Sequence, residues 1–182
     1  MIRPVMTIVC CLLSMTACSL VDRLPGEDSL YHSLPGSEFI LHREITIRPG
    51  QLRMSFQDGT PAYGYSEFYP HCDLVLPVIS KEPQIIPAGR YRIGSVMGRT
   101  HYVERPQGPV QLAAADGVNG LLADSSSEWY MFAYHMSLQS ETSATRLQLI
   151  CGGAYNYPYY VRYPSLAEIQ QSLGDYGTLK LP

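Results

Sequence analysis

Residues 129–139, WYMFAYHMSLQ, and residues 145–151, TRLQLIC, are the two stretches that decide the fold. In the first, the side chains at the even positions from 130 to 138 are all apolar or aromatic, so they would share one face of a strand. In the second, Leu147, Leu149 and Cys151 also share one parity. Only a short polar segment, residues 140–144, separates the two stretches. We therefore predict an antiparallel hairpin with one buried face.

The same two-residue periodicity recurs towards the N-terminus. Short strands are predicted in FILHREITI (39–47), QLRMSFQ (51–57), YPHCDLVLPV (69–78) and RYRIGSVM (90–97). Turns are expected at Pro49-Gly50 and Asp58-Gly59, whereas residues 60–68 and 104–127 have the composition of loops. The domain is thus expected to be built mainly from short antiparallel strands.

One helix is expected near the C-terminus. Ser165 and Glu168 have the spacing of a capping box, in which each side chain satisfies a backbone N–H of the first turn. Leu166, Ile169 and Leu173 follow at helical spacing, and a glycine then ends the helix. The predicted fold class is mainly β: an antiparallel β-sandwich or open barrel with one short C-terminal helix.

The N-terminus has the three parts of an export signal. Arg3 supplies a positive charge, residues 5–15 form an apolar run, and small residues precede Cys18. The run is about half the length of roughly 20 residues that a transmembrane helix needs. A cleaved secretory signal with an unmodified cysteine, and a buried N-terminal helix, are the alternatives.

The segment Met15-Thr16-Ala17-Cys18 resembles the lipobox of bacterial lipoproteins, and the body resembles small uncharacterised envelope lipoproteins of proteobacteria. The resemblance implies cleavage of a signal peptide, residues 1–17, and a diacylglycerol and an N-acyl chain on Cys18. Two or three acyl chains give stable membrane anchoring. Ser19 after the cysteine implies sorting to the outer membrane, facing the periplasm, rather than retention in the inner membrane.

The remainder of the chain divides into a tether and a single domain. Residues 18–37 contain two Leu-Pro-Gly turns and little periodicity, and are predicted to be a flexible tether. Residues 38–182 are predicted to form one β-rich globular domain. The chain of 182 residues has 13 Lys and Arg against 16 Asp and Glu, which gives a formal net charge of −3. This balance does not favour binding to nucleic acid, which requires a basic face.

The predicted export to an oxidising compartment indicates the chemical state of each cysteine. Cys10 and Cys11 would leave with the signal and Cys18 would be acylated, so that Cys72 and Cys151 remain as a pair in an oxidising environment. We predict a Cys72–Cys151 disulfide, because both residues lie on strand faces that are expected to be buried. A redox or nucleophilic thiol and two free buried thiols are the alternatives.

Catalytic patterns are not apparent. The five histidines, His32, His42, His71, His101 and His135, show no metal-site spacing, and the chain has no Gly-x-Ser-x-Gly and no phosphate-binding glycine loop. His135 is predicted to face away from the apolar stripe of its strand, and a metal site built from distant histidines is the minor alternative. We expect no catalytic residues, no metal and no cofactor other than the acyl chains.

Tyrosines are concentrated near the C-terminus, and the chain has 14 in all. Tyr155, Tyr157, Tyr159, Tyr160 and Tyr163 either pack the last loop onto the sheet or form a surface for a partner or glycan. A second aromatic group, Tyr63, Tyr65, Phe68 and Tyr69, would lie beside them if Cys72 and Cys151 are joined. The sequence therefore favours a non-enzymatic, lipid-anchored protein that binds another envelope component. A β-barrel-like binder of a lipid or glycan is the alternative. An envelope enzyme whose site is assembled from several loops is the third and least favoured interpretation.

Overall fold

The computed structural model describes residues 30–105, 127–140 and 146–182. The predicted signal peptide, the predicted lipidation site Cys18 and the first part of the predicted tether lie outside these residues. The described elements are η2 (Leu30–His32), β1 (Glu38–Leu41), β2 (Ile45–Ile47), β3 (Arg53–Gln57), β4 (Thr60–Ala62), β5 (His71–Val75), β6 (Gln84–Ile86), β7 (Gly89–Arg105), β8 (Ser127–Ser140), β9 (Leu147–Gly152), α2 (Leu166–Leu173), η3 (Gly174–Tyr176) and β10 (Gly177–Lys180).

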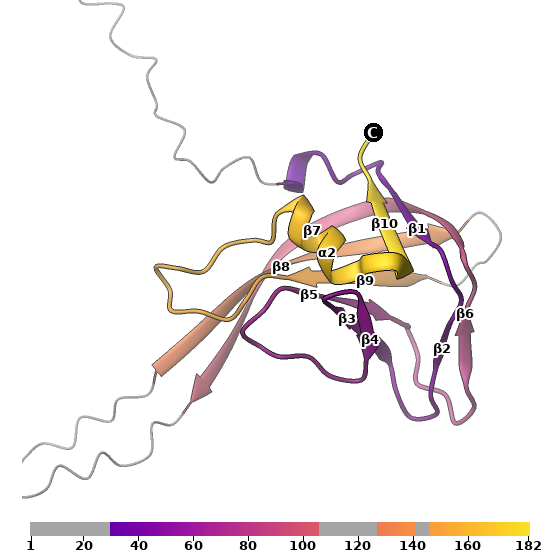
Figure 1. The fold of residues 1–182 in the computed structure, drawn as a ribbon, viewed down its shortest axis with the longest axis horizontal. Helices are drawn as coiled ribbons and strands as arrows, with labels where there is room; N and C mark the ends of the chain where they lie inside the picture. The colour runs from indigo at the N-terminus through magenta and orange to yellow at the C-terminus, as the bar shows by residue number, and fades with distance from the viewer. Residues whose placement is uncertain (1–29, 106–126, 141–145) are drawn as a thin grey trace, which may run out of the picture.

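Eight strands form one curled antiparallel sheet in the order β10-β1-β7-β8-β9-β5-β3-β4, and β2 pairs with β6 in a separate two-stranded ribbon (Figure 1). The fold is therefore mainly β, as predicted, and of the two predicted architectures it is the open barrel. The predicted hairpin is confirmed, because β8 pairs with β9 from Leu138↔Leu147 to Ala133↔Gly152. No helix among the described residues is long and apolar enough to cross a membrane.

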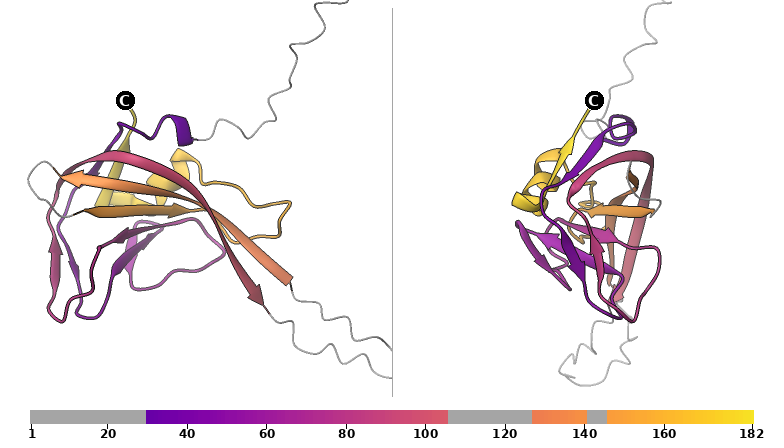
Figure 2. Two further views of the ribbon diagram at one scale, coloured as in Figure 1. Left: turned by 180° about the vertical axis from the view of Figure 1, so that it is seen from behind. Right: turned by 90° about the vertical axis from the view of Figure 1, so that its right-hand side faces the viewer.

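The inner face of the sheet carries the apolar core. Phe39, Phe56, Leu74, Tyr134 and Leu149 are all less than 2% exposed, and they come from five different strands. The helix α2 adds Ile169 and Leu173 to this core and contacts β10 near one edge of the sheet and β3 and β5 near the other (Figure 2). The helix thus covers the open side of the half-barrel, which explains why one short helix suffices.

Part of the segment predicted as a tether is folded onto the domain. Leu34 is fully buried in the core, the N–H of Gly36 donates to the Ile93 carbonyl, and Ser37 accepts from the Ile93 N–H. Residues 30–37 therefore pack with the globular body, so the predicted flexible tether does not extend to residue 37. The burial of Leu34, the leucine of the second Leu-Pro-Gly turn, is the physical reason, because removing its apolar side chain from water stabilises the folded segment.

Strand β7 is much longer than the predicted segment 90–97. It pairs with β8 along most of its length, and the register shifts between Ile93 and Val96. The extra residue of this bulge reverses which parity faces the core, so that Tyr91 and Ile93 are buried on one side of it and Val96 on the other. Together β7 and β8 extend beyond the rest of the sheet (Figures 1 and 2).

The predicted capping box of α2 is present. The N–H of Glu168 donates to the Ser165 hydroxyl, and the Glu168 carboxylate accepts from the N–H of Ser165. Arg162 adds two charge-assisted bonds to the same carboxylate, at 2.7 and 2.6 Å. These contacts, with the Arg162 bonds contributing most, lower the pKa of Glu168 to about 2.

We expect this carboxylate to contribute acid-sensitive stability. Because its pKa is lower in the folded chain than in the unfolded chain, its contribution is complete above about pH 4.5 and is lost as the pH falls towards 2. Solvent screening limits the contribution to about 1 kcal/mol. In urea titrations between pH 2 and 6, Glu168→Gln should lower the free energy of unfolding at pH 6 and reduce its pH dependence. Glu82→Gln, an exposed loop variant, is the control. Equal pH dependence in Glu168→Gln and wild type would contradict the expectation.

Candidate functional site

The paired cysteines bring two aromatic loops together. Cys72 on β5 lies directly opposite Cys151 on β9, and their sulfur atoms are 2.09 Å apart, as predicted for a disulfide. Because β5 and β9 are antiparallel, the loop that precedes β5 and the loop that follows β9 leave the sheet at the same end. The N–H of Tyr155 donates to the Glu67 carbonyl at 2.8 Å and joins the two loops.

Trp129 on β8 lies between these loops. Its ring meets Phe68 edge-on, with centroids 5.8 Å apart, and it packs against Tyr157 at 4.9 Å. Tyr159 and Tyr160 follow in the same turn and are 95% and 72% exposed. We call Phe68, Tyr69, Trp129, Tyr157, Tyr159 and Tyr160 the aromatic surface. The predicted proximity of the two aromatic groups is confirmed at Phe68 and Tyr157. Tyr63 lies elsewhere, beside Arg48.

The five C-terminal tyrosines divide between the two interpretations. Tyr157, Tyr159 and Tyr160 are exposed, as a binding surface requires. Tyr163 instead packs on the inner face, where its ring stacks on Tyr134 with centroids 4.6 Å apart. Tyr155 is half-buried, and burial raises the pKa of its hydroxyl. The surface therefore comprises three of the five tyrosines, and Tyr163 is corrected to a packing residue.

A buried polar cluster lies on the outer face of the sheet, beneath the loop that precedes β5. His71 and Asp73 are 2% and 3% exposed, which is unusual for polar side chains on the outer face. Asp73 accepts from Arg53 at 3.0 Å through one carboxylate oxygen, while the other has no partner among the described residues. Tyr65 stacks on the His71 ring at 3.5 Å, and burial lowers the pKa of His71.

A histidine pair lies on the same outer face. His101 and His135 are on adjacent strands, two residues to either side of the cross-strand pair Arg99↔Ala133, and their Nε2 atoms are 3.0 Å apart. The short Ala133 side chain leaves space for both rings above it. Burial lowers the pKa of His101, and burial and the neighbouring His101 and Arg99 lower that of His135 to about 4.

The sequence predicted the outward orientation of His135 but not its partner. The two histidines are separated by 34 positions and show no recognisable spacing. Only the pairing register of β7 against β8 brings the two histidines together. The bulge in β7 makes this register difficult to infer from the alternation of apolar and polar residues. Within the described ranges, no group of three His, Cys, Asp or Glu residues is arranged to hold a metal ion.

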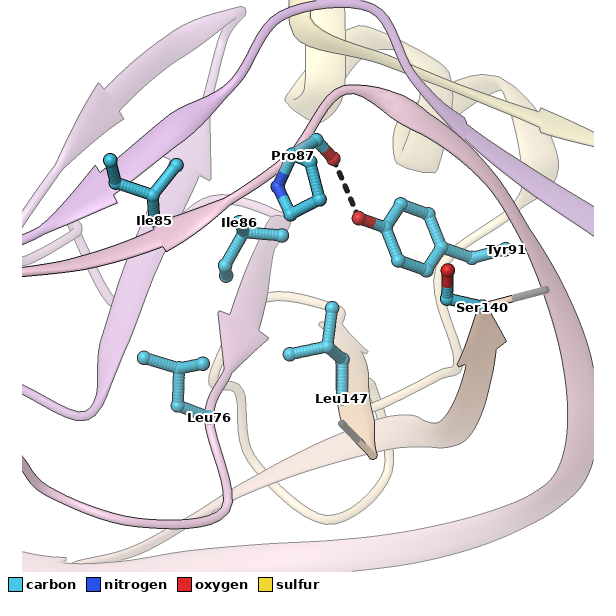
Figure 3. A pocket seen from close by; sticks show the side chains of 7 residues that line it. All are labelled: Leu76, Ile85, Ile86, Pro87, Tyr91, Ser140 and Leu147. Atoms are coloured by element: carbon cyan, nitrogen blue, oxygen red, sulfur yellow. Dashed lines mark hydrogen bonds between the residues drawn. The ribbon is translucent and has the colours of Figure 1, made fainter. Parts of the chain in front are cut away.

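A small hollow is found among the described residues of the half-barrel. One hollow, at the end of the half-barrel near β6, has a volume of about 50 Å³, compared with roughly 300–1,000 Å³ for typical ligand pockets (Figure 3). The side chain of Tyr91 lines this hollow, and its hydroxyl donates to the Pro87 carbonyl at 2.6 Å. The hollow is lined by Leu76, Ile85, Ile86, Pro87, Tyr91, Ser140 and Leu147. Its size suits a water molecule or two rather than a lipid or glycan.

Comparison with known proteins gave no relative: no family model matches the chain, and no curated protein or solved structure is significantly similar to it.

Proposed function

We propose that this chain is a non-enzymatic lipoprotein of the cell envelope that binds an envelope protein through its aromatic surface. The observation that carries the proposal is the exposure of several large rings on two loops beside Trp129. Exposed aromatic side chains that lie close together are typical of protein interfaces, because they bury a large area with few rotatable bonds. The lipid anchor on Cys18, proposed from the sequence, would hold this surface at the outer membrane.

Two features favour an external protein partner over a ligand inside the barrel. The inner face is filled by large side chains such as Phe39, Phe56 and Tyr134, and the hollow near β6 is small. The rings of the aromatic surface come from three segments, namely β8, the loop that precedes β5 and the loop that follows β9. A protein partner could contact all three segments at once. A glycan stacked on Tyr159 or Tyr160 is the second candidate, since both rings are exposed.

Site-specific photocrosslinking tests the proposal. The full-length protein is produced in its native membranes with a photoreactive phenylalanine at position 159, and the control carries the same group at position 31. Tyr31 is 40% exposed but lies on η2. We expect one adduct of defined mass at position 159, weakened by Phe68→Ser and absent at position 31. A muramidase-sensitive adduct would support the glycan, and no specific adduct from a folded, membrane-bound protein would overturn both candidates.

The anchor is tested separately. Cys18→Ala should move the protein from the membrane fraction to the soluble fraction and prevent labelling with an alkyne fatty acid. The Cys11→Ala variant, which removes a cysteine of the proposed signal peptide, should retain both properties. Membrane attachment and labelling of the Cys18→Ala variant would contradict the lipoprotein assignment without bearing on the aromatic surface.

A further inference from the structure

Small residues form the floor of the outer face beside the histidine pair. The register places Ala133 on β8 opposite Gly152 on β9, so these two neighbouring positions carry only a single methyl group, between Arg99 on β7 and His71 on β5. The Met131 sulfur occupies the space above Gly152, 2.6 Å from the point where a Cβ would stand. His101 lies directly opposite Met131 in the β7–β8 pairing. Two imidazoles and one thioether therefore gather over one small area of the sheet.

We propose that His101, His135 and Met131 bind one copper(I) ion on this outer face. The proposal concerns a site separate from the aromatic surface and does not depend on the partner proposed above.

The spacing of the two histidines suits a shared metal. Two imidazole nitrogens bound to one ion at about 2.0–2.1 Å are roughly 2.9–3.4 Å apart when the angle at the metal is between square and tetrahedral. The observed separation of 3.0 Å lies in this range. The rings are almost parallel, at 11°, and their Nε2 atoms face each other, so each ring must rotate away from the line between the two nitrogens before both lone pairs meet one ion.

The protonation state also suits metal binding. Without metal, one Nε2–H donates to the other Nε2. Moving that hydrogen to Nδ1 of the same ring frees the second lone pair with no net loss of a proton and no redox change. Imidazole binds metals in its neutral form, in which each ring offers one nitrogen lone pair.

The donor set and the local charge favour copper(I) over zinc. Thioether sulfur is a soft ligand that selects copper(I), whereas zinc sites usually contain thiolate, imidazole or carboxylate ligands. Arg99 lies opposite Ala133 and contributes positive charge beside the histidines. Asp73 contributes a compensating negative charge near His101 but is paired with Arg53. A monovalent ion is repelled less by Arg99 than a divalent ion.

The test is a competition titration of the full-length protein. Free thiols are first alkylated, because Cys10, Cys11 and Cys18 in any unprocessed protein would otherwise bind copper. Copper(I) is generated with ascorbate, which leaves disulfides intact, and is competed against a chromogenic chelator. We expect wild type and the exposed control His32→Asn to bind one equivalent. His101→Asn/His135→Asn should lose this equivalent, and Met131→Leu, which keeps the side-chain volume, should bind at least tenfold more weakly.

NMR of the imidazole nitrogens provides a readout that folding defects do not imitate. Addition of one equivalent of copper(I), which is diamagnetic, should shift the signals of His101 and His135 and leave those of His32 and His42 unchanged. Folding of each variant is checked by circular dichroism, and the single variant His135→Asn is the substitute if the double variant is unfolded. Full binding by a folded histidine variant, or equal affinity in wild type and Met131→Leu, would overturn the proposal.

Discussion

The double variant Cys72→Ala/Cys151→Ala is expected to lose about 4 kcal/mol of folding free energy relative to the oxidised wild type. The two residues are 79 positions apart, so the crosslink removes a large share of the conformational entropy of the unfolded chain. Both are fully buried in the core, so their replacement by alanine also leaves unfilled volume. Urea titration at pH 7, monitored by the fluorescence of the single tryptophan, gives the loss.

A second double variant separates the two contributions. Cys72→Val/Cys151→Val removes the crosslink but approximately preserves the volume, and valine is favourable in a strand. It should retain more stability than the alanine variant, and the difference between them measures the cavity. Wild type should be destabilised by a reductant, whereas neither variant should respond. A wild type that is indifferent to reductant, or that reacts with iodoacetamide at Cys72 when folded, would contradict a structural disulfide.

Alternation of apolar residues predicted the strands whose two faces differ in environment. The inner faces of β8 and β9 are continuously apolar, so Tyr134 and Leu149 could be assigned to the core directly, although Met131 and Ala133 on the outer face of β8 are buried as well. The helix was predictable because its signals are local: Ser165 and Glu168 begin it and Gly174 ends it. In each case the determining interactions lie within a few residues along the chain.

Strands defined by their partners were not predictable. β10 is only four residues long and follows a helix, and it exists as a strand because it pairs with β1. β4 contains Pro61, but it lies at the edge of the sheet, where a missing N–H is tolerated. The far half of β7 is polar, with Arg99 and His101 on its outer face, and its strand conformation depends on pairing with β8. Tertiary pairing overrides local propensity in these segments.

The candidate sites also divide into features that the local sequence predicts and features that depend on tertiary pairing. Exposure of the tyrosine-rich loop could be proposed from composition, but the separation of Tyr163 from Tyr159 depends on the course of the loop around the sheet. The disulfide prediction was sufficient to place Phe68 near Tyr157, because the crosslink fixes two distant segments. By contrast, the pairing of His101 with His135 requires the register of β7, which the bulge after Ile93 displaces by one residue.

Gly174→Ala is expected to destabilise the fold by about 3 kcal/mol. Gly174 ends α2 with φ of +53° and ψ of −134°, a conformation that is favourable essentially only for glycine and costs a residue with a Cβ roughly 1–3 kcal/mol. An added Cβ would also overlap the Cα of Gly59 in the β3–β4 turn. That turn is held against the helix, since the N–H of Gly59 donates to the Ser172 carbonyl and Gln171 donates to Asp58. Neither backbone can move away without breaking these contacts, which adds a further 1–3 kcal/mol.

Gly50→Ala is the matched control for this prediction. Gly50 also has a positive φ, +76°, but an added Cβ there would meet no heavy atom within 4 Å. The control therefore incurs only the backbone cost, and the difference between the two variants measures the contact between the helix end and the β3–β4 turn. Urea titrations of both variants provide the comparison. Equal destabilisation would show that the helix end tolerates displacement from Gly59, and the helix would then close the half-barrel through its apolar residues, Ile169 and Leu173, alone.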